Sequence, residues 1–212
     1  MARETNEEKL IRMTEIEREI MLSHPGMRIA GIDEVGRGPL AGPVVTACVS
    51  IPFSKLVPGV DDSKKLSEIK REKLYPLIME AAVYAKTAWM SPEVIDEINI
   101  LNATKRAMEE CAAGLENGLF LVDAVAGLHL PGEAFPIVHG DAQSYMIAAA
   151  SVVAKVERDR YMARLHEEYP MYGFIRNKGY GTKEHIEAIR TYGPCPHHRM
   201  SFIQKFLPGA HV

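Results

Sequence analysis

Apolar runs of strand length alternate with longer segments of helical periodicity along most of the chain. Five runs of apolar or β-branched residues predict strands at residues 28–33, 43–51, 83–89, 119–123 and 136–139. Apolar positions at helical spacing, together with capping signals, predict helices at residues 5–22, 67–82, 99–116, 144–168 and 182–191, with a short helix beginning at Ser91. The first two strands are joined by a short glycine-containing connection, so we expect them to form a hairpin.

The composition of the chain changes near residue 170. The helix at residues 144–168 carries small side chains in its first half, which would let it lie close to a sheet, and Tyr169-Pro170 would end it. After that point glycine, aromatic and basic residues dominate. We therefore expect a main domain at residues 1–170, including the N-terminal helix, and a basic helical extension at residues 171–212.

Composition is ordinary for a soluble globular protein. Hydrophobic residues make up 47% and charged residues 25% of the 212 residues, which is enough to bury a sizeable core. Residues 2–12 are too highly charged for a secretory signal, and no apolar run approaches bilayer length, so a cytoplasmic protein without a membrane span is expected. Cys48, Cys111 and Cys195 are widely spaced and odd in number, which indicates free thiols rather than disulfides or a zinc site.

The net charge of −3 is unevenly distributed. Residues 171–212 contain six Lys or Arg against two Glu, so this extension carries +4 while the rest of the chain carries −7. A basic extension on an acidic body is typical of a protein whose extension contacts phosphates while its body binds metal ions. On charge alone, a solvated surface without a partner is the alternative.

Four carboxylates stand at the ends of apolar runs: Asp33 and Glu34, Asp123, and Asp141. Open α/β sheets build their sites at strand ends and in the loops that follow. Successive side chains of a strand point to opposite faces, so Asp33 and Glu34 can share a site only if the strand ends there and the backbone bends. Four converging carboxylates without cysteine favour Mg²⁺ or Mn²⁺ over zinc. Two such ions roughly 3.5–4 Å apart can support phosphodiester hydrolysis.

Each acid also has a purely structural explanation. Asp141 could cap the helix that follows it, Asp123 could open a turn, and Asp33 with Glu34 could simply be solvated. Three further acids compete for membership of the site: Asp61, Asp62 and Asp159. The first two of these lie in a turn-rich loop, and the third, between two arginines, is expected on a helix surface.

Gly36-Arg37-Gly38 directly follows the first pair of acids. Pro39 and the spacing to Gly42 break the Gly-x-Gly-x-x-Gly pattern, which argues against a dinucleotide-binding Rossmann site. The two glycines would instead let the backbone approach a ligand closely, and the arginine between them could meet a phosphate.

Five motifs occur in order between about residue 28 and residue 206. They are the stretches 33–38, 61–67, 148–156 with Arg158-Asp159-Arg160, 177–182 and 198–202. At this spacing they resemble the bacterial type 2 ribonuclease H family, ribonuclease HII. The resemblance implies an α/β, ribonuclease H-like fold, in which a mixed central β-sheet is flanked by helices and followed by a C-terminal helical extension.

The resemblance also implies an activity. Members of the family are endoribonucleases that hydrolyse the RNA strand of RNA–DNA hybrids and incise on the 5′ side of single ribonucleotides embedded in duplex DNA. The implied chemistry is two-metal-ion phosphodiester hydrolysis with Mg²⁺ or Mn²⁺, leaving 5′-phosphates, in ribonucleotide removal during DNA replication or repair.

The motifs carry the family's functional residues onto this chain. The metal-binding, catalytic carboxylates match Asp33, Glu34, Asp123 and Asp141. The loop that senses the ribose 2′-hydroxyl matches Gly36, Arg37 and Gly38, and the tyrosine that packs on the neighbouring sugar matches Tyr180. Phosphate contacts are expected from Lys64, Lys178 and Arg199. A core or helix-capping role is the alternative for Tyr180, and simple solvation is the alternative for the basic residues.

Two positions depart from the family pattern. Ala124 follows the third acid where the family has glycine, and His139 precedes Gly140-Asp141 where the family has lysine. Ala124 could restrict the turn after Asp123, and His139 would make the site less positive at neutral pH. Three other histidines are interpreted as structural or phosphate-facing rather than as metal ligands: His185, His197 and His198.

Two other classes of function remain as alternatives. A hybrid-binding protein without catalysis would keep the surface and bind without cutting, whereas a DNA exonuclease on the same general fold would act on all-DNA ends. The complete set of acids and the glycine-arginine-glycine loop favour the ribonuclease. A monomer is expected, and residues 204–208 make no persuasive sliding-clamp peptide.

Overall fold

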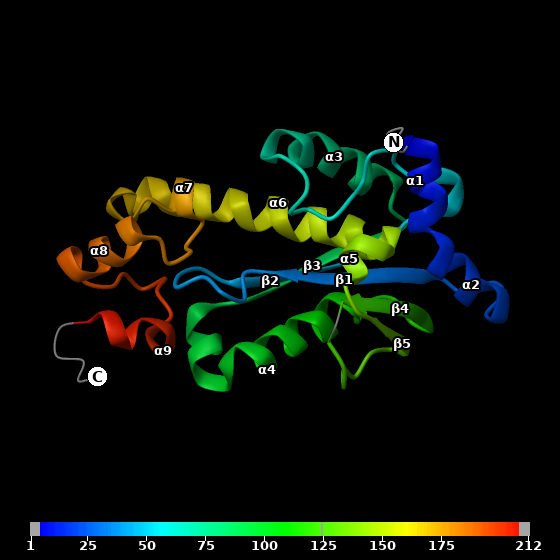
Figure 1. Cartoon of the computed structure of the whole chain (residues 1–212). Coiled ribbons are helices and arrows are strands. Elements are labelled where there is room, and N and C mark those ends of the chain that lie inside the picture. Colours follow the sequence, from blue (N-terminus) through cyan, green and yellow to red (C-terminus); the bar gives the residue numbers. More distant parts are fainter. Residues whose placement is uncertain (1–4, 124, 208–212) are drawn as a thin grey trace.

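The computed structural model describes residues 5–123 and 125–207. A five-stranded mixed sheet forms its centre, with strand order β3-β2-β1-β4-β5 (Figure 1). The strands are β1 (Ile29–Val35), β2 (Val44–Ser50), β3 (Tyr84–Met90), β4 (Gly118–Asp123) and β5 (Gly132–Ile137). β2 pairs antiparallel with β1 and β3, whereas β4 pairs parallel with β1 and β5. The predicted hairpin and the mixed central sheet are confirmed.

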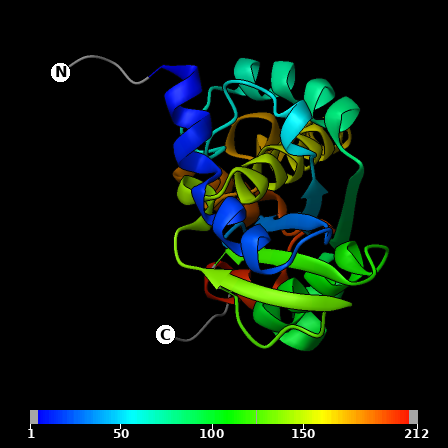
Figure 2. The same cartoon turned by 90° about the vertical axis from the view of Figure 1, so that its right-hand side faces the viewer.

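Helices cover both faces of this sheet. α6 (Tyr145–Glu168) and α3 (Glu68–Ala81) lie on one face, and α4 (Pro92–Ala112) lies on the other, as Figures 1 and 2 show from two sides. α6 approaches the sheet closely, as the sequence predicted, and at Met146 the absence of a side chain on Gly31 allows this approach. A Cβ atom on Gly31 of β1 would lie only 2.0 Å from the carbonyl carbon of Met146 in α6, so helix and sheet backbones are in direct contact.

The predicted N-terminal helix is interrupted. It forms α1 (Asn6–Met13) and α2 (Glu15–Ser23), separated at Thr14, and a capping box of Thr5 and Glu8 is present at its start. The Thr14 hydroxyl donates a hydrogen bond to the Leu10 carbonyl at 2.7 Å. Hydroxyl groups that bond back to the preceding turn commonly bend helices, and this local bond accounts for the break.

Asn99 interrupts α4, as the prediction of a short helix followed by a longer one required. Its φ of 65° and ψ of 163° are not helical, and its side-chain oxygen accepts hydrogen bonds from the amides of Leu101 and Asn102. The second part of α4 ends at Ala112, four residues before the predicted end. Asn99 is therefore both the stop of one helix and the cap of the next.

The fifth strand lies earlier in the chain than predicted. β5 spans Gly132–Ile137, and the expectation of a strand at 136–139 is wrong for its second half, because His139 adopts a left-handed backbone with φ 55°. That turn leads into a short helix, α5 (Gly140–Gln143), which the sequence pattern did not reveal. β5 is an edge strand, where Pro136 is tolerated because only one side of the strand is paired.

Short helices pack around the far end of α6 (Figure 1). They are η2 (Pro170–Tyr172), α7 (Phe174–Asn177), α8 (Lys183–Tyr192), α9 (Met200–Ile203) and η3 (Gln204–Phe206); a further short turn, η1 (Phe53–Lys55), lies after β2. Phe174 and Ile189 are buried against Met162 of α6. Among the described helices, none is both long enough and apolar enough to cross a membrane. All three cysteines are buried free thiols, as predicted.

Candidate active site

The first and third acids lie side by side on neighbouring parallel strands. Ile32 of β1 pairs with Val122 of β4, so Asp33 and Asp123 are the next residues on the two strands. Ile32 and Val122 pack in the core beneath α4. Because side chains alternate along a strand, Asp33 and Asp123 point to the opposite face of the sheet, toward α6. Asp33 is almost fully buried, and Asp123 is half-buried.

Glu34 lies one position further along β1 and does not occupy a bend. The strand continues to Val35, with Glu34 paired to Thr46 and Val35 paired to Val45. The expectation that the strand ends at Asp33 is wrong, because the antiparallel ladder with β2 extends over two more residues. Glu34 is half-buried, and its pKa is raised mainly by burial and further by the charge of Asp123, which lies close to it.

The fourth acid belongs to the short helix α5. The Asp123 carboxylate accepts a hydrogen bond of 2.8 Å from the Gly140 amide, which ties the end of β4 to the start of α5. Asp141 is 6% exposed. It does not cap the long helix, because the Ser144 hydroxyl accepts the Ile147 amide there. The helix-cap explanation for Asp141 is thereby excluded.

The acids repel one another electrostatically. The pKa of Asp33 is raised well above its usual range, first by burial and then by the charges of Glu34 and Asp123. Burial likewise raises the pKa of Asp123, with a further contribution from Asp141. Acids whose charged forms are this unfavourable favour a positive ion between them.

Lys64 supplies one positive charge at this site. Its ammonium lies 2.9 Å from Oδ2 of Asp141, and this hydrogen bond, partly offset by desolvation, raises the pKa of Lys64 above its usual value. The side chain of Lys64 is otherwise largely exposed. The predicted phosphate contact thus lies beside one of the acids.

The donor set fits a hard divalent cation. Oε2 of Glu34 is buried and has no hydrogen-bond partner among the described residues, so it is an oxygen that a cation could use without displacing another contact. In the same described part of the chain, no three His, Cys, Asp or Glu side chains converge as a ready-made metal cluster. Asp33 and Glu34 are consecutive on the strand, so their side chains leave the backbone on opposite sides.

The glycine-arginine-glycine loop begins where β1 ends. Gly36 has φ +95°, and a Cβ there would lie 2.3 Å from Nε of Arg158, so only glycine fits. Arg37 is partly exposed and reaches back to Glu34, with 3.4 Å between the guanidinium and Oε1. Gly38 faces Tyr180, whose Cε1 would be 3.8 Å from an added Cβ.

Tyr180 is held at the surface next to this loop. Its ring is 44% exposed, which excludes a core aromatic role. Asn177 shapes the turn before it, because its backbone carbonyl accepts the Tyr180 amide at 2.8 Å and its side chain accepts the Gly179 amide at 2.8 Å. Lys178 in this turn has a left-handed backbone, and its ammonium lies 3.3 Å from Glu68.

Arg199 differs from its predicted role. It was expected to contact phosphates, but its side chain is fully buried and donates to the carbonyls of Gly36, Arg37 and Gly42 at 2.6 to 3.0 Å. The expectation of an exposed basic residue is wrong here, because the loop folds over Arg199 and satisfies its guanidinium from inside.

The competing acids have other partners. Asp61 is paired with Lys9. Asp159 is buried between Lys155 at 2.6 Å and Arg71 at 3.4 Å, so the expectation that it lies on a helix surface is wrong. Neither of these acids joins the four at the strand ends.

Two residues near the site, Ser151 and Arg158, were not predicted from the sequence. The Ser151 hydroxyl bonds to Asp33 and is 2.7 Å from the hydroxyl of Ser63. Arg158 donates to the carbonyls of Ala41, Pro43 and Lys178. Both lie in the motif at residues 148–160, which signals a helix but does not show which side chains face the site.

Of the two positions that depart from the family pattern, the structure describes one. Ala124 lies outside the described residues. His139 forms the left-handed turn before α5, and its proximity opposes the rise in the pKa of Asp123. His185 and His198 are buried and face each other. His197 contacts the ring of Tyr161.

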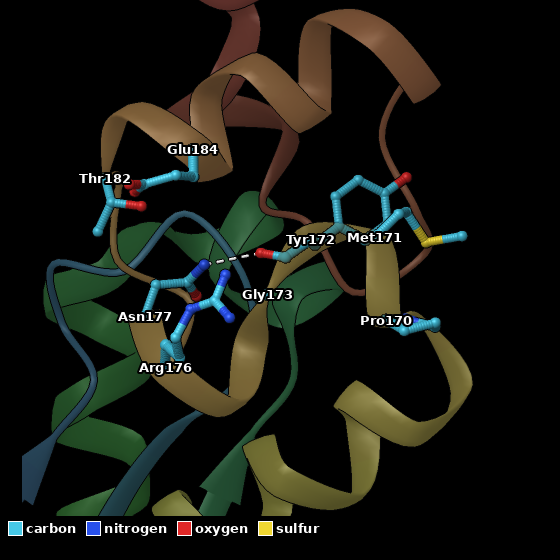
Figure 3. Close-up of a pocket in the computed structure, with 8 residues that line it drawn as sticks. All are labelled: Pro170, Met171, Tyr172, Gly173, Arg176, Asn177, Thr182 and Glu184. Carbon is cyan, nitrogen blue, oxygen red and sulfur yellow. Dashed lines mark hydrogen bonds between the residues drawn. The ribbon is translucent and has the colours of Figure 1, made fainter.

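A separate pocket lies in the C-terminal extension. It has a volume of about 330 Å³ and is lined by Arg176, Asn177, Thr182 and Glu184, among others (Figure 3). Asn177 donates a 2.7 Å hydrogen bond to the Tyr172 carbonyl beside it. None of the four acids lines this pocket, so it is distinct from the carboxylate site.

Comparison with known proteins agrees with this geometry. The ribonuclease HII family matches residues 30–205. The ribonuclease HII of Caldanaerobacter subterraneus is 52% identical over 183 residues, which cover 85% of this chain and 76% of that protein. The ribonuclease H2 structure from Pyrococcus horikoshii superposes with a TM-score of 0.72 at 26% identity, covering 85% of this chain and 97% of that one. The Archaeoglobus fulgidus ribonuclease HII, solved in complex with PCNA, gives a TM-score of 0.71 at 29% identity over 82% and 93% of the two chains.

The mixed sheet with acids at the ends of adjacent parallel strands defines a ribonuclease H-like nuclease. The extent of the sequence match is more specific: the chain belongs to the ribonuclease HII family. It is a metal-dependent endoribonuclease that cleaves RNA in RNA–DNA hybrids.

Proposed function

We propose that Asp33, Glu34, Asp123 and Asp141 hold two Mg²⁺ or Mn²⁺ ions and make up the catalytic site. The observation that carries this proposal is the pair of mutually repelling carboxylates of buried Asp33 and half-buried Asp123 on adjacent strands, with the partnerless oxygen of Glu34 beside them. When bound, two divalent ions supply an activated water and stabilise the charge on the leaving oxygen. The four carboxylates orient the ions, and the Gly140 amide orients Asp123.

The proposed substrates include duplex DNA with a single ribonucleotide, incised on its 5′ side. Gly36, Arg37 and Gly38 read the ribose 2′-hydroxyl, the group that distinguishes RNA from DNA at one position. Tyr180 packs against the sugar, which its exposure and its place beside Gly38 support. Lys64 and Lys178 contact phosphates, and the basic extension at residues 171–212 contributes to binding.

One assay on three duplexes of the same sequence tests this function. All-DNA, hybrid and single-ribonucleotide duplexes are incubated with Mg²⁺ or Mn²⁺, and the products are mapped to nucleotide resolution. We expect cutting of the hybrid and of the single-ribonucleotide duplex, but not of the all-DNA duplex. Binding without cutting would identify a catalytically inactive hybrid-binding protein, and degradation from all-DNA ends would identify an exonuclease.

Matched variants test the division of labour within the site. Asp123→Asn should abolish cutting, since one carboxylate ligand loses its charge, while the folded protein still binds the duplex. Arg37→Ala should impair substrate choice more than metal binding, whereas Asp33→Asn should weaken metal binding directly. Equal loss of metal affinity in Arg37→Ala and Asp33→Asn, measured by calorimetry, would refute the division.

The remaining proposals concern the oligomeric state and the cellular role. We propose a monomer that acts in the cytoplasm in ribonucleotide removal during DNA replication or repair. Sedimentation at several concentrations tests the monomer, and the ribonucleotide content of genomic DNA in a deletion strain tests the role.

A further inference from the structure

Two consecutive buried residues, His198 and Arg199, connect the C-terminal extension to the ribose-reading surface. Arg199 is fully buried and forms no ion pair within the described ranges, yet it donates four hydrogen bonds to the loop carbonyls of Gly36, Arg37 and Gly42. A buried guanidinium is tolerated only when its donors are satisfied. These hydrogen bonds therefore satisfy both the guanidinium of Arg199 and the carbonyls, and they hold the loop backbone in place.

The second connection is a chain of hydrogen bonds through two histidines. The Cys195 amide donates to Nδ1 of His198 at 3.0 Å, and Nε2 of His198 lies 3.0 Å from Nε2 of His185. Nδ1 of His185 lies 2.9 Å from the Tyr180 carbonyl. This chain ends on the backbone of the residue proposed to pack on the sugar.

The partners at both ends determine the protons on the two rings. An amide can only donate, so Nδ1 of His198 accepts from Cys195 and its Nε2 carries the proton; the competing contact to the Cys195 carbonyl is longer, at 3.4 Å. A carbonyl can only accept, so Nδ1 of His185 donates to Tyr180 and its Nε2 accepts from His198. The contacts with Cys195 and with Tyr180 require the same arrangement: both rings are neutral, His198 donates to His185, and His185 donates to Tyr180.

The two connections meet on the same surface. The Leu40 amide donates to the Gly179 carbonyl at 2.8 Å, and the Arg199 amide donates to the Leu40 carbonyl at 2.9 Å. Ala41 forms a bridge with His198. The loop that carries Gly38 and the turn that carries Tyr180 are thus both attached to the segment at residues 195–199.

We propose that His198 and Arg199 are positioning residues for ribose recognition. Arg199 sets the backbone of Gly36 and Arg37, and His198, acting through His185, sets the backbone of Tyr180, so that the loop and the tyrosine face a sugar at a fixed separation. This inference rests on the proposed role of the loop and Tyr180, and it extends that role to residues that touch no substrate.

The test measures discrimination rather than activity alone. Discrimination is the ratio of dissociation constants for an all-DNA duplex and the same duplex with one ribonucleotide, measured with Ca²⁺ in place of the catalytic metal. The variants are made in the full chain. Hydrogen exchange at residues 36–43 and 178–182 is measured on the same samples.

His198→Leu should lower the discrimination ratio by about fivefold, since one net hydrogen bond to the positioning chain is lost, and hydrogen exchange at both segments should accelerate. His198→Gln should recover most of the ratio, because its amide can donate to His185. Arg199→Lys should also lower the ratio, since an ammonium cannot reproduce the planar fork. His197→Gln, at the neighbouring position whose side chain contacts Tyr161 and takes part in neither connection, should match the wild type.

Two results would overturn the inference. One is a ratio and an exchange pattern in His198→Leu and Arg199→Lys that match those of His197→Gln. The other is an equal loss in His198→Leu and His198→Gln, which would show a packing role without the hydrogen bond. If His198→Leu does not fold, the Arg199→Lys and His198→Gln results decide.

Direct substitutions separate this inference from the function on which it rests. Arg37→Ala and Tyr180→Ala should each lower the discrimination ratio. If they do and the positioning variants do not, only the positioning inference fails. If neither does, the ribose-reading role of the loop and the tyrosine fails as well.

Discussion

Gly36 and Gly38 are two residues apart and do different things. Gly36 has a positive φ, and an added Cβ would meet both Nε of Arg158 and the Pro43 carbonyl, at 2.3 and 2.7 Å. Gly38 has room, since the nearest atom to its added Cβ is Cε1 of Tyr180 at 3.8 Å. One glycine is required by the fold, and the other keeps the surface beside the tyrosine open.

Alanine at each position therefore makes a matched pair. Gly36→Ala should lower the free energy of unfolding by roughly 2–4 kcal/mol, through backbone strain and the clash with a buried arginine. Gly38→Ala should change it by less than about 0.5 kcal/mol and act on ribonucleotide discrimination instead. Chemical denaturation measures both. Equal stability of the two variants would contradict the structural distinction.

His198 makes stability depend on pH in a known direction. Burial and the neighbouring His185 lower its pKa to about 4, below the ordinary value of about 6.5. The unfolded chain therefore binds a proton more readily, so this histidine destabilises the fold as pH falls from about 6.5 toward 4, by up to roughly 3 kcal/mol. The effect is absent above about pH 7, where both states are neutral.

The difference between wild type and His198→Gln isolates this contribution. Denaturation at several pH values should show the wild type losing stability relative to the variant as the solution becomes acidic. His129→Gln, at an exposed histidine, serves as the control and should follow the wild type. Parallel pH curves for wild type and His198→Gln would contradict the prediction.

Helix α4 depends on one asparagine at its break. Asn99 has φ 65° and ψ 163°, a backbone region that suits glycine, and its side chain accepts the amides of Leu101 and Asn102. The two contributions oppose each other, because the side chain caps the following helix while its Cβ strains the backbone. α4 packs on one face of the sheet, so this position affects how that helix lies on it.

Asn99→Ala and Asn99→Gly should separate these two contributions. Alanine loses the cap and keeps the strain, and should destabilise the protein by about 1–2 kcal/mol. Glycine loses the cap but relieves the strain, so it should be less destabilising than alanine, against the usual order within a helix. Thermal denaturation decides between them. A glycine variant less stable than the alanine variant would show that Asn99 is not strained.

Metal binding by the proposed site should be coupled to folding of the whole protein. The free protein carries buried acids whose pKa values are raised, so its folded form binds protons more readily than the unfolded chain. Without metal, these acids should therefore make the fold less stable as pH rises through their folded pKa values, the opposite of the His198 effect. A divalent ion relieves that repulsion.

Adding Mg²⁺ to metal-free protein should raise the melting temperature. At a hundredfold excess over the dissociation constant the gain is about 2.7 kcal/mol, which corresponds to roughly 5–10 °C for a chain of this size. Asp123→Asn should reduce this shift, and Lys65→Ala, on a charge that faces Asp61 rather than the site, should not. An undiminished shift in Asp123→Asn would place the ion elsewhere.

The pattern of apolar and polar residues was sufficient to predict most of the helices and strands. Apolar alternation and capping residues predicted the first four strands, the hairpin and the long α6, but only the end of β5. The small residues of α6 predicted its contact with the sheet. These features are local, since each depends on residues within one or two turns. The motifs identified the family for the same reason, because they are short and ordered along the chain.

The features that this pattern did not predict depend on contacts between segments that are distant in the chain. Asp33 and Asp123 became neighbours only through the parallel pairing of β1 with β4, and β1 continued past Asp33 only because β2 offered partners. The sequence predicted that Arg199 is exposed. The loop that contains Gly42, 157 positions earlier in the chain, buries it instead. An arginine is the same in sequence whether water or carbonyls satisfy its donors, and only the tertiary structure decided which.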